Sequence, residues 1–338
     1  MKLSSEWTEF VRDNPDAEGP PLTLEDLKEP EALRKIIDKA DLEAKVALYQ
    51  KNEFRHLLEI DTVNTAFPAR DGAEVRGRVY LPRKKAKSAP LCVFFHSGGM
   101  IMGNLDAEDF ECRTLAWEVG LVVFSVAYRL APEHPFPCGP YDCFDSLAWI
   151  LQDPARFHAD PKQGVLLCGN SAGAQLAACT AIQAKMAHPP IHITGQILKV
   201  PTTMHYKAFP PQFAAECVGR LENAHAPLLE TEEMNINQDL YGVPESQWTD
   251  PLAFPIWADP TVFPPTYVQV NSADPLRDDG LLFERSLREA GVSTRLEFFD
   301  GYPHNFEQVM PRDHPASERV EKAMVAAANW QLSLIKDE

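Results

Sequence analysis

The chain has 338 residues, enough for two ordinary domains or for one large α/β domain with insertions. With 45% hydrophobic and 24% charged residues, its composition is that of an ordinary globular protein, which excludes a disordered, collagen-like or fibrous chain. The formal net charge of −17 repels phosphate backbones and anionic lipid surfaces, so we expect neither nucleic acid nor a membrane as a partner.

The seven cysteines are expected to be reduced and structural, because they form no Cys-x-x-Cys pair and several lie in apolar runs. No group of His, Cys and Asp has the spacing of a zinc site, so we expect no metal. The first residues lack the apolar stretch of a signal peptide, and no run of roughly 18 apolar residues occurs without a charge. We therefore expect a cytoplasmic protein.

Residues 1–58 are predicted to form an N-terminal helical segment. Apolar side chains recur there at three- and four-residue intervals with charges between them, which is typical of an amphipathic helix. These side chains are Leu24, Leu27, Leu33, Ile36 and Ile37.

From about residue 60 the pattern changes to short strands. Two strands on either side of the turn at 70–72 predict a hairpin. Three apolar runs at 91–96, 121–128 and 164–170 are each followed by a segment of helical length. Strands that alternate with helices predict a mostly parallel sheet.

Strands are also expected at 192–200, 265–272 and 292–300, with a helix near 278–290 and another at the C-terminus. More than sixty residues separate the strand ending at Val200 from the next, far more than in an ordinary loop. We predict that this segment is an insertion that acts as a lid. Apolar residues of the insertion and of the N-terminal segment are expected to roof a pocket over Ser171: Phe209, Phe213, Leu221, Leu228, Leu229, Trp7 and Phe10.

The strand at 164–168 runs directly into Gly-Asn-Ser-Ala-Gly, residues 169–173, and a helix-like segment follows. A nucleophile elbow needs this order, because its serine adopts a strained backbone and the flanking glycines let strand and helix approach. A chain of this length contains a GxSxG pentapeptide by chance with a probability on the order of a tenth. The placement between strand and helix therefore carries the prediction that Ser171 is a nucleophile.

A second glycine-rich segment, His-Ser-Gly-Gly-Met at 96–100, follows the first apolar run. Acyl transfer creates an oxyanion, and backbone amides of glycines can bind it without a side chain in the way. We predict that Gly98, Gly99 and the N–H of Ala172 form the oxyanion hole. A plain Gly-Gly turn would be the interpretation if no GxSxG were present. His96 is assigned to positioning of this loop.

Candidates for the acid and the base are restricted by the chain order Ser, acid, His of α/β hydrolases. Asp274 follows a buried strand at its C-terminal end, where α/β sheets place their sites, and is the predicted acid. Asp278 and Asp279 fall where Asp commonly caps a helix, and Asp300 is a weaker competitor.

His304 lies in a loop immediately after a strand and is the predicted general base. His314, in a charged turn before the last helix, is expected to be an exposed surface residue. The remaining histidines between Ser171 and the C-terminus precede Asp274 and break the order: His188, His192, His205 and His225.

Five motifs occur in order along the chain: HSGGMIMGNLD, YRLAPEHPFP, GNSAG, DPLRDDG and YPHNF. Together they resemble the hormone-sensitive lipase family of α/β-hydrolase esterases, from about residue 60 to the C-terminus. The resemblance implies carboxylester hydrolysis without metal or cofactor. It also implies a triad of Ser171, Asp274 and His304.

The same resemblance implies a catalytic domain at 59–338, with a cap built from residues 1–58 and an insertion at about 202–260. Family members often pair through the last strand and helix, so the resemblance is compatible with a homodimer, and the sequence leaves the oligomeric state open. The sequence departs from the family motifs at three places. These departures affect the expected substrate fit and the charge around the nucleophile elbow, but the oxyanion donors are retained. Ser97 replaces the first glycine of HGGG, Asn170 replaces the usual Asp, and Ala174-Gln175 replaces Gly-Asn.

We therefore predict an α/β-hydrolase fold, a mostly parallel sheet flanked by helices, with a helical cap. The predicted function is that of a serine carboxylesterase acting on small-molecule esters with short to medium acyl groups, through an acyl-enzyme. An alternative is a biosynthetic α/β hydrolase acting as a thioesterase or deacetylase on a natural-product intermediate, which nothing in the sequence excludes. A ligand-binding receptor on the same fold is disfavoured because His304, the base that such relatives have lost, is retained.

Overall fold

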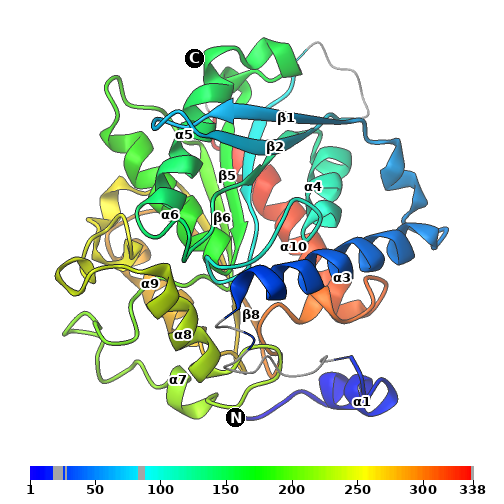
Figure 1. Cartoon of the computed structure of the whole chain (residues 1–338), viewed down its shortest axis with the longest axis vertical. Coiled ribbons are helices and arrows are strands. Elements are labelled where there is room, and N and C mark those ends of the chain that lie inside the picture. Colours follow the sequence, from blue (N-terminus) through cyan, green and yellow to red (C-terminus); the bar gives the residue numbers. More distant parts are fainter. Residues whose placement is uncertain (18–25, 27–28, 83–87, 336–338) are drawn as a thin grey trace.

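The computed structural model describes residues 1–17, 26, 29–82 and 88–335. Its centre is an eight-stranded sheet in the order β1-β2-β4-β3-β5-β6-β7-β8 (Figure 1). The predicted hairpin of β1 and β2 is antiparallel, β2 pairs antiparallel with β4, and the other neighbours are parallel, so the predicted sheet is confirmed. The strands are β1 Thr62–Pro68, β2 Glu74–Tyr80, β3 Leu91–Phe95, β4 Val122–Ala127, β5 Val165–Asn170, β6 Gly195–Lys199, β7 Thr266–Asn271 and β8 Thr294–Phe299.

Helices cover both faces of the sheet, which explains why the central strands are apolar along their whole length. In β3, Leu91, Val93 and Phe95 enter one hydrophobic cluster, whereas Cys92 and Phe94 enter another. The first cluster includes residues of α5 Cys138–Gln152, α6 Ala172–Met186 and α9 Arg277–Glu289. The second includes residues of α4 Asp109–Thr114, the π-helical turn Leu115–Val119 that follows it, and α10 Pro315–Leu332. The core therefore lies in two layers, one on each face.

The N-terminal segment contains α1 Ser5–Asp13, α3 Pro30–Gln50 and the 3-10 turn Arg55–Glu59. In α3 the predicted apolar face is only partly correct. Leu33 is buried, but Ile36 is 67% exposed, because α3 lies across the surface and contacts the body along a narrow stripe. Leu24 and Leu27 lie outside the described residues.

The predicted insertion lies between β6 and β7 and contains two helices, α7 Gly219–Glu222 and α8 Thr231–Tyr241. Three 3-10 turns follow at Glu245–Gln247, Pro255–Trp257 and Pro260–Val262. Figure 1 shows α7 and α8 in the lower left of the molecule and α3 running from its centre to the right. Within the described part of the chain, no helix is both long and apolar enough to cross a membrane.

Asp278 and Asp279 in the first turn of α9 hold this insertion in place. The carboxylate of Asp278 accepts the N–H groups of Val218 and Gly219. Asp279 accepts the N–H groups of Thr203 and Met204, and Arg220 donates to it as well. The expectation that these aspartates cap α9 was therefore wrong, because their side chains point to the insertion.

Candidate active site

Ser171 lies at a sharp turn between β5 and α6, with φ 54° and ψ −117°. This backbone conformation is strained for a residue with a side chain, and strain of this kind is typical of functional sites. The N–H of Ser171 donates to the carbonyl of Lys199 at 2.8 Å, which fixes the turn to β6. A Cβ at Gly173 would collide with the carbonyl oxygen of Phe95. Only glycine there allows the close approach of helix and strand that the pentapeptide predicts.

Three predicted site residues meet at this turn. The Oγ of Ser171 lies 2.9 Å from Nε2 of His304, and Nδ1 of His304 lies 2.7 Å from Oδ2 of Asp274. Asp274 follows β7 and His304 follows β8, so both reach the site from the C-terminal ends of parallel strands. All three side chains are buried, and the N–H of Leu276 donates to the second oxygen of Asp274 at 2.8 Å.

The environment of His304 favours its protonated form. Burial of the ring opposes a positive charge, but the charge of Asp274 and the hydrogen bond to it outweigh burial and raise the pKa of His304 above its usual value of 6.5. The carboxylates of Glu307 and Glu233 act in the same direction. An imidazole held in this way can accept a proton from a serine hydroxyl and keep it while a tetrahedral intermediate exists.

The loop after β3 carries two of the residues predicted to bind an oxyanion. Gly98 and Gly99 have φ values of 119° and 60°, and a Cβ at Gly98 would collide with the carbonyl of Met102. In the part of the chain that the structure describes, the N–H groups of Gly98 and Gly99 have no backbone acceptor. Ala172 is the first residue of α6, where an N–H has no acceptor inside the helix. These donors are therefore available to an oxyanion.

His96 has the positioning role predicted for it. Its ring stacks on Tyr128 with centroids 4.2 Å apart, and the Tyr128 hydroxyl donates to the His96 carbonyl at 2.9 Å. Burial lowers the pKa of His96 to about 4, so the ring is neutral near pH 7.

A family model described as the alpha/beta hydrolase fold matches residues 92–308. The chain belongs to this family. An AB hydrolase superfamily protein of Schizosaccharomyces pombe is 33% identical over 282 residues, 83% of this chain and 82% of the relative. Carboxylesterase NlhH of Mycobacterium tuberculosis is 34% identical over 252 residues, 72% of this chain and 75% of the relative. The crystal structure of vibralactone cyclase matches with a TM-score of 0.88 and 26% identity, over 99% of this chain and 96% of that one.

The cavity of this α/β hydrolase at Ser171 has a volume of about 270 Å³. Of the residues predicted to roof it, Leu228 and Leu229 line the cavity. The others were assigned wrongly. Trp7, for example, packs in a separate cluster with Phe299 and Phe306. Most of the apolar lining comes instead from Met100, Met102, Met234, Tyr241 and Leu276.

Asp300 and His314, the competing candidates for the acid and the base, do not line the cavity at Ser171. Asp300 is exposed and accepts a hydrogen bond from the Ser272 hydroxyl at 2.9 Å. His314 is the N-cap of α10, and its Nδ1 accepts the N–H of Ala316 at 3.2 Å. His314 is therefore partly buried, whereas the sequence predicts a fully exposed residue.

The three departures from the family motifs have distinct surroundings. The N–H of Ser97 donates to Oε1 of Glu108 at 3.0 Å, which holds the oxyanion loop from behind. Gln175 donates to the carbonyl of Ala253 and so joins α6 to the end of the insertion. The amide of Asn170 is fully buried, and neither of its polar atoms has a hydrogen-bond partner among the described residues.

Sequence reasoning missed the contribution of α8 to the cavity, which comes from Glu233, Met234, Asn237, Gln238 and Tyr241. No motif marks these residues. Their place over Ser171 depends on how the insertion packs on the body of the α/β hydrolase. The one available signal was the length of the insertion, which predicted a lid but no particular side chain.

Proposed function

We propose that this α/β hydrolase is a serine carboxylesterase acting on esters with short to medium acyl groups through an acyl-enzyme intermediate. The observation that carries the proposal is the continuous contact from Asp274 through His304 to the Ser171 hydroxyl. The unpaired N–H groups of the neighbouring loop support it. The name of the relative NlhH, a carboxylesterase, agrees with this chemistry.

In the proposed reaction, Oγ of Ser171 attacks the ester carbonyl while Nε2 of His304 takes its proton. The N–H groups of Gly98, Gly99 and Ala172 bind the oxyanion. The tetrahedral intermediate then collapses, and His304 gives the proton to the leaving alcohol. Water, deprotonated by His304, releases the acid in a second cycle of the same kind. Asp274 holds the ring in the required orientation throughout.

A second candidate is supported by the similarity to the solved structure of vibralactone cyclase, whose name is that of a cyclase and not of an esterase. The chain would then act as a thioesterase or deacetylase on a natural-product intermediate. The same Ser171 and His304 would form the same acyl-enzyme, because a thioester reacts by the same attack on its carbonyl. A panel of model esters, thioesters and amides assayed with the purified protein separates the two candidates.

The nucleophile is tested with a fluorophosphonate probe and mass spectrometry of the labelled peptide. We expect labelling at Ser171, and a loss of ester hydrolysis of several thousand-fold or more in Ser171→Ala. His304→Ala is expected to be about as damaging, because members of a triad act as one unit, while His314→Ala serves as the matched control. Labelling of another serine, or a larger loss in His314→Ala, contradicts the assignment.

A further inference from the structure

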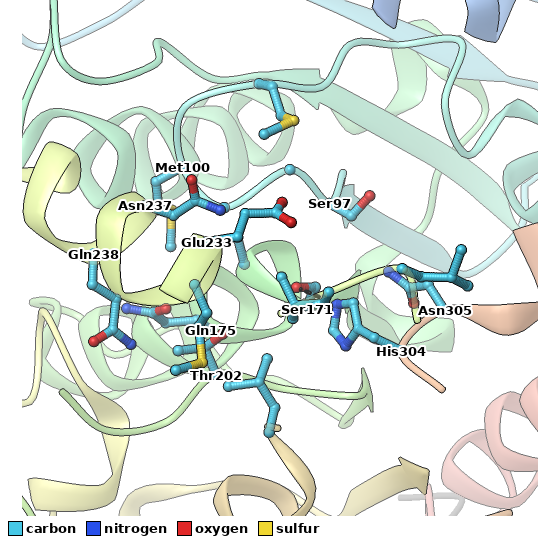
Figure 2. A pocket seen from close by; sticks show the side chains of 18 of the residues that line it. Ser97, Met100, Ser171, Gln175, Thr202, Glu233, Asn237, Gln238, His304 and Asn305 are labelled. Carbon is cyan, nitrogen blue, oxygen red and sulfur yellow. Dashed lines mark hydrogen bonds between the residues drawn. The ribbon is translucent and has the colours of Figure 1, made fainter. Parts of the chain in front are cut away.

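Two polar side chains of α8 face the reacting serine. Glu233 and Asn237 are four residues apart on the helix and therefore share one face. Both line the cavity that contains Ser171 and His304. Figure 2 shows the two side chains next to each other, across the cavity from Ser171. They take no part in the proposed acyl transfer.

Asn237 lies directly over the oxyanion loop. A Cβ at Gly99 would come within 2.6 Å of the Asn237 amide nitrogen, so the amide and the loop are in close contact. The side chain is only 6% exposed, and its Oδ1 has no hydrogen-bond partner in the described part of the chain. The amide nitrogen faces the loop, and a half-turn of the amide about its Cβ–Cγ bond presents Oδ1 to the cavity in its place.

Glu233 places a carboxyl group near the catalytic ring. Burial raises the pKa of Glu233 to about 7, and the positive charge of His304 opposes this rise. Glu233 in turn contributes to the raised pKa of His304, which lines the same cavity. Among the described residues, no arginine or lysine forms an ion pair with Glu233.

The rest of this wall is apolar. Leu229, Met234 and Tyr241 surround the two polar side chains. Ligand pockets commonly combine an apolar lining with a few polar groups that fix the orientation of the ligand. The carboxylate of Glu233 is an acceptor, and the turned amide of Asn237 offers Oδ1 beside it, so the matching ligand group is a donor.

We propose that Glu233 and Asn237 form a specificity subsite that selects esters carrying a hydrogen-bond donor, a hydroxyl or an ammonium group, on the part of the substrate that lies against α8. The inference rests on the proposed esterase function and defines its substrate class. A site built around such a contact rejects the analogue that lacks the donor, because the acceptors of the site are then left unpaired.

The test compares esters that differ only by hydroxyl against methyl. Ethyl 3-hydroxybutyrate and ethyl 3-methylbutyrate place the difference in the acyl group, and 2-hydroxyethyl butyrate and propyl butyrate place it in the alcohol. Ethyl 3-aminobutyrate adds the ammonium form. Hydrolysis is followed by acid release, and rates are divided by the amount of Ser171 that a fluorophosphonate probe titrates. We expect kcat/KM to favour the donor-bearing ester by about tenfold or more in the acyl or the alcohol pair.

The variants Glu233→Gln and Asn237→Leu are expected to reduce this preference several-fold each. In Asn237→Leu, the leucine lies over Gly99 and can disturb the loop. Glu233→Gln keeps the size of the side chain and an acceptor oxygen, so we expect this variant to fold. A larger loss for the amino ester than for the hydroxy ester in Glu233→Gln identifies the ammonium as the selected donor. Glu232→Gln, one residue earlier and exposed, is the matched control and keeps the wild-type ratio.

The subsite is overturned if the wild type hydrolyses each donor-bearing ester and its methyl analogue with nearly equal kcat/KM. It is also overturned if the two variants leave the wild-type ratio unchanged. Either result leaves the esterase proposal intact. Absence of hydrolysis together with absence of labelling at Ser171 overturns the esterase proposal, and the subsite with it.

Discussion

Lys199 Nζ lies 2.7 Å from Oε1 of Glu307, and both side chains are almost completely buried. Burial opposes both charges, but attraction between the partners raises the pKa of Lys199 and lowers that of Glu307. Lys199 ends β6 and accepts the N–H of Ser171, whereas Glu307 follows three residues after His304. The ion pair therefore joins the strand behind Ser171 to the loop that carries His304.

Removal of Lys199 is expected to destabilise the fold. In Lys199→Met the carboxylate of Glu307 stays buried without its closest cation, which costs about 3–5 kcal/mol. The double variant Lys199→Met/Glu307→Leu removes both charges and is expected to regain most of this loss. Urea unfolding followed by circular dichroism measures the difference. A single variant as stable as the wild type, or a double variant no better than the single one, contradicts this account.

The acid limb of the pH profile of kcat/KM reports the ionisation of His304. His304 must be neutral to accept the serine proton, so activity is lost as the pH falls through its pKa. Because that pKa is raised, we expect the limb to lie above pH 6.5. Glu307→Gln removes one of the charges that raise it, so the limb should move to lower pH.

His314→Ala is the control for this profile and should leave the limb where it is. A rate that stays constant well below pH 6 contradicts histidine as the base. A limb that moves to higher pH in Glu307→Gln contradicts the electrostatic argument.

The sequence was sufficient to predict that Ser171, Asp274 and His304 meet, because each follows a strand that its apolar run identifies and the chain order excludes most competitors. The sequence did not predict features that depend on packing between segments far apart in the chain. The apolar character of Trp7 predicts burial but not that its neighbours are Phe299 and Phe306. The place of α8 over the cavity, and the pairing of Lys199 with Glu307, have no local signal for the same reason.

Glu108 supports the oxyanion loop at the cost of a buried carboxyl group. It accepts the N–H of Ser97, and burial, with repulsion from Glu111, raises its pKa from 4.5 to about 7. The folded state therefore holds the proton more tightly than the unfolded chain, and the stability this gives is present below pH 4.5 and lost as the pH rises to about 7. At 1.36 kcal/mol for each unit of pKa, the loss is about 3 kcal/mol.

Glu108→Gln keeps an acceptor for Ser97 and removes this titration. The free energy of unfolding of the variant, relative to the wild type, should rise by about 3 kcal/mol between pH 4.5 and pH 8. Urea titrations at the two pH values measure it, with Glu118→Gln, an exposed site, as the control. A difference between variant and wild type that does not change with pH contradicts the raised pKa.

The volume of the cavity limits the acyl chain. This volume is about 270 Å³, so only a limited number of methylene groups can enter. Each methylene that enters contributes up to about 0.8 kcal/mol, or about fourfold in kcat/KM, until the cavity is full. With p-nitrophenyl esters, kcat/KM should therefore rise from acetate, peak at a short to medium chain and fall for palmitate. The net charge of −17 should prevent any gain at an anionic lipid surface. A steady rise to palmitate, with a jump on emulsified triglyceride, would identify a true lipase whose cap opens at the interface.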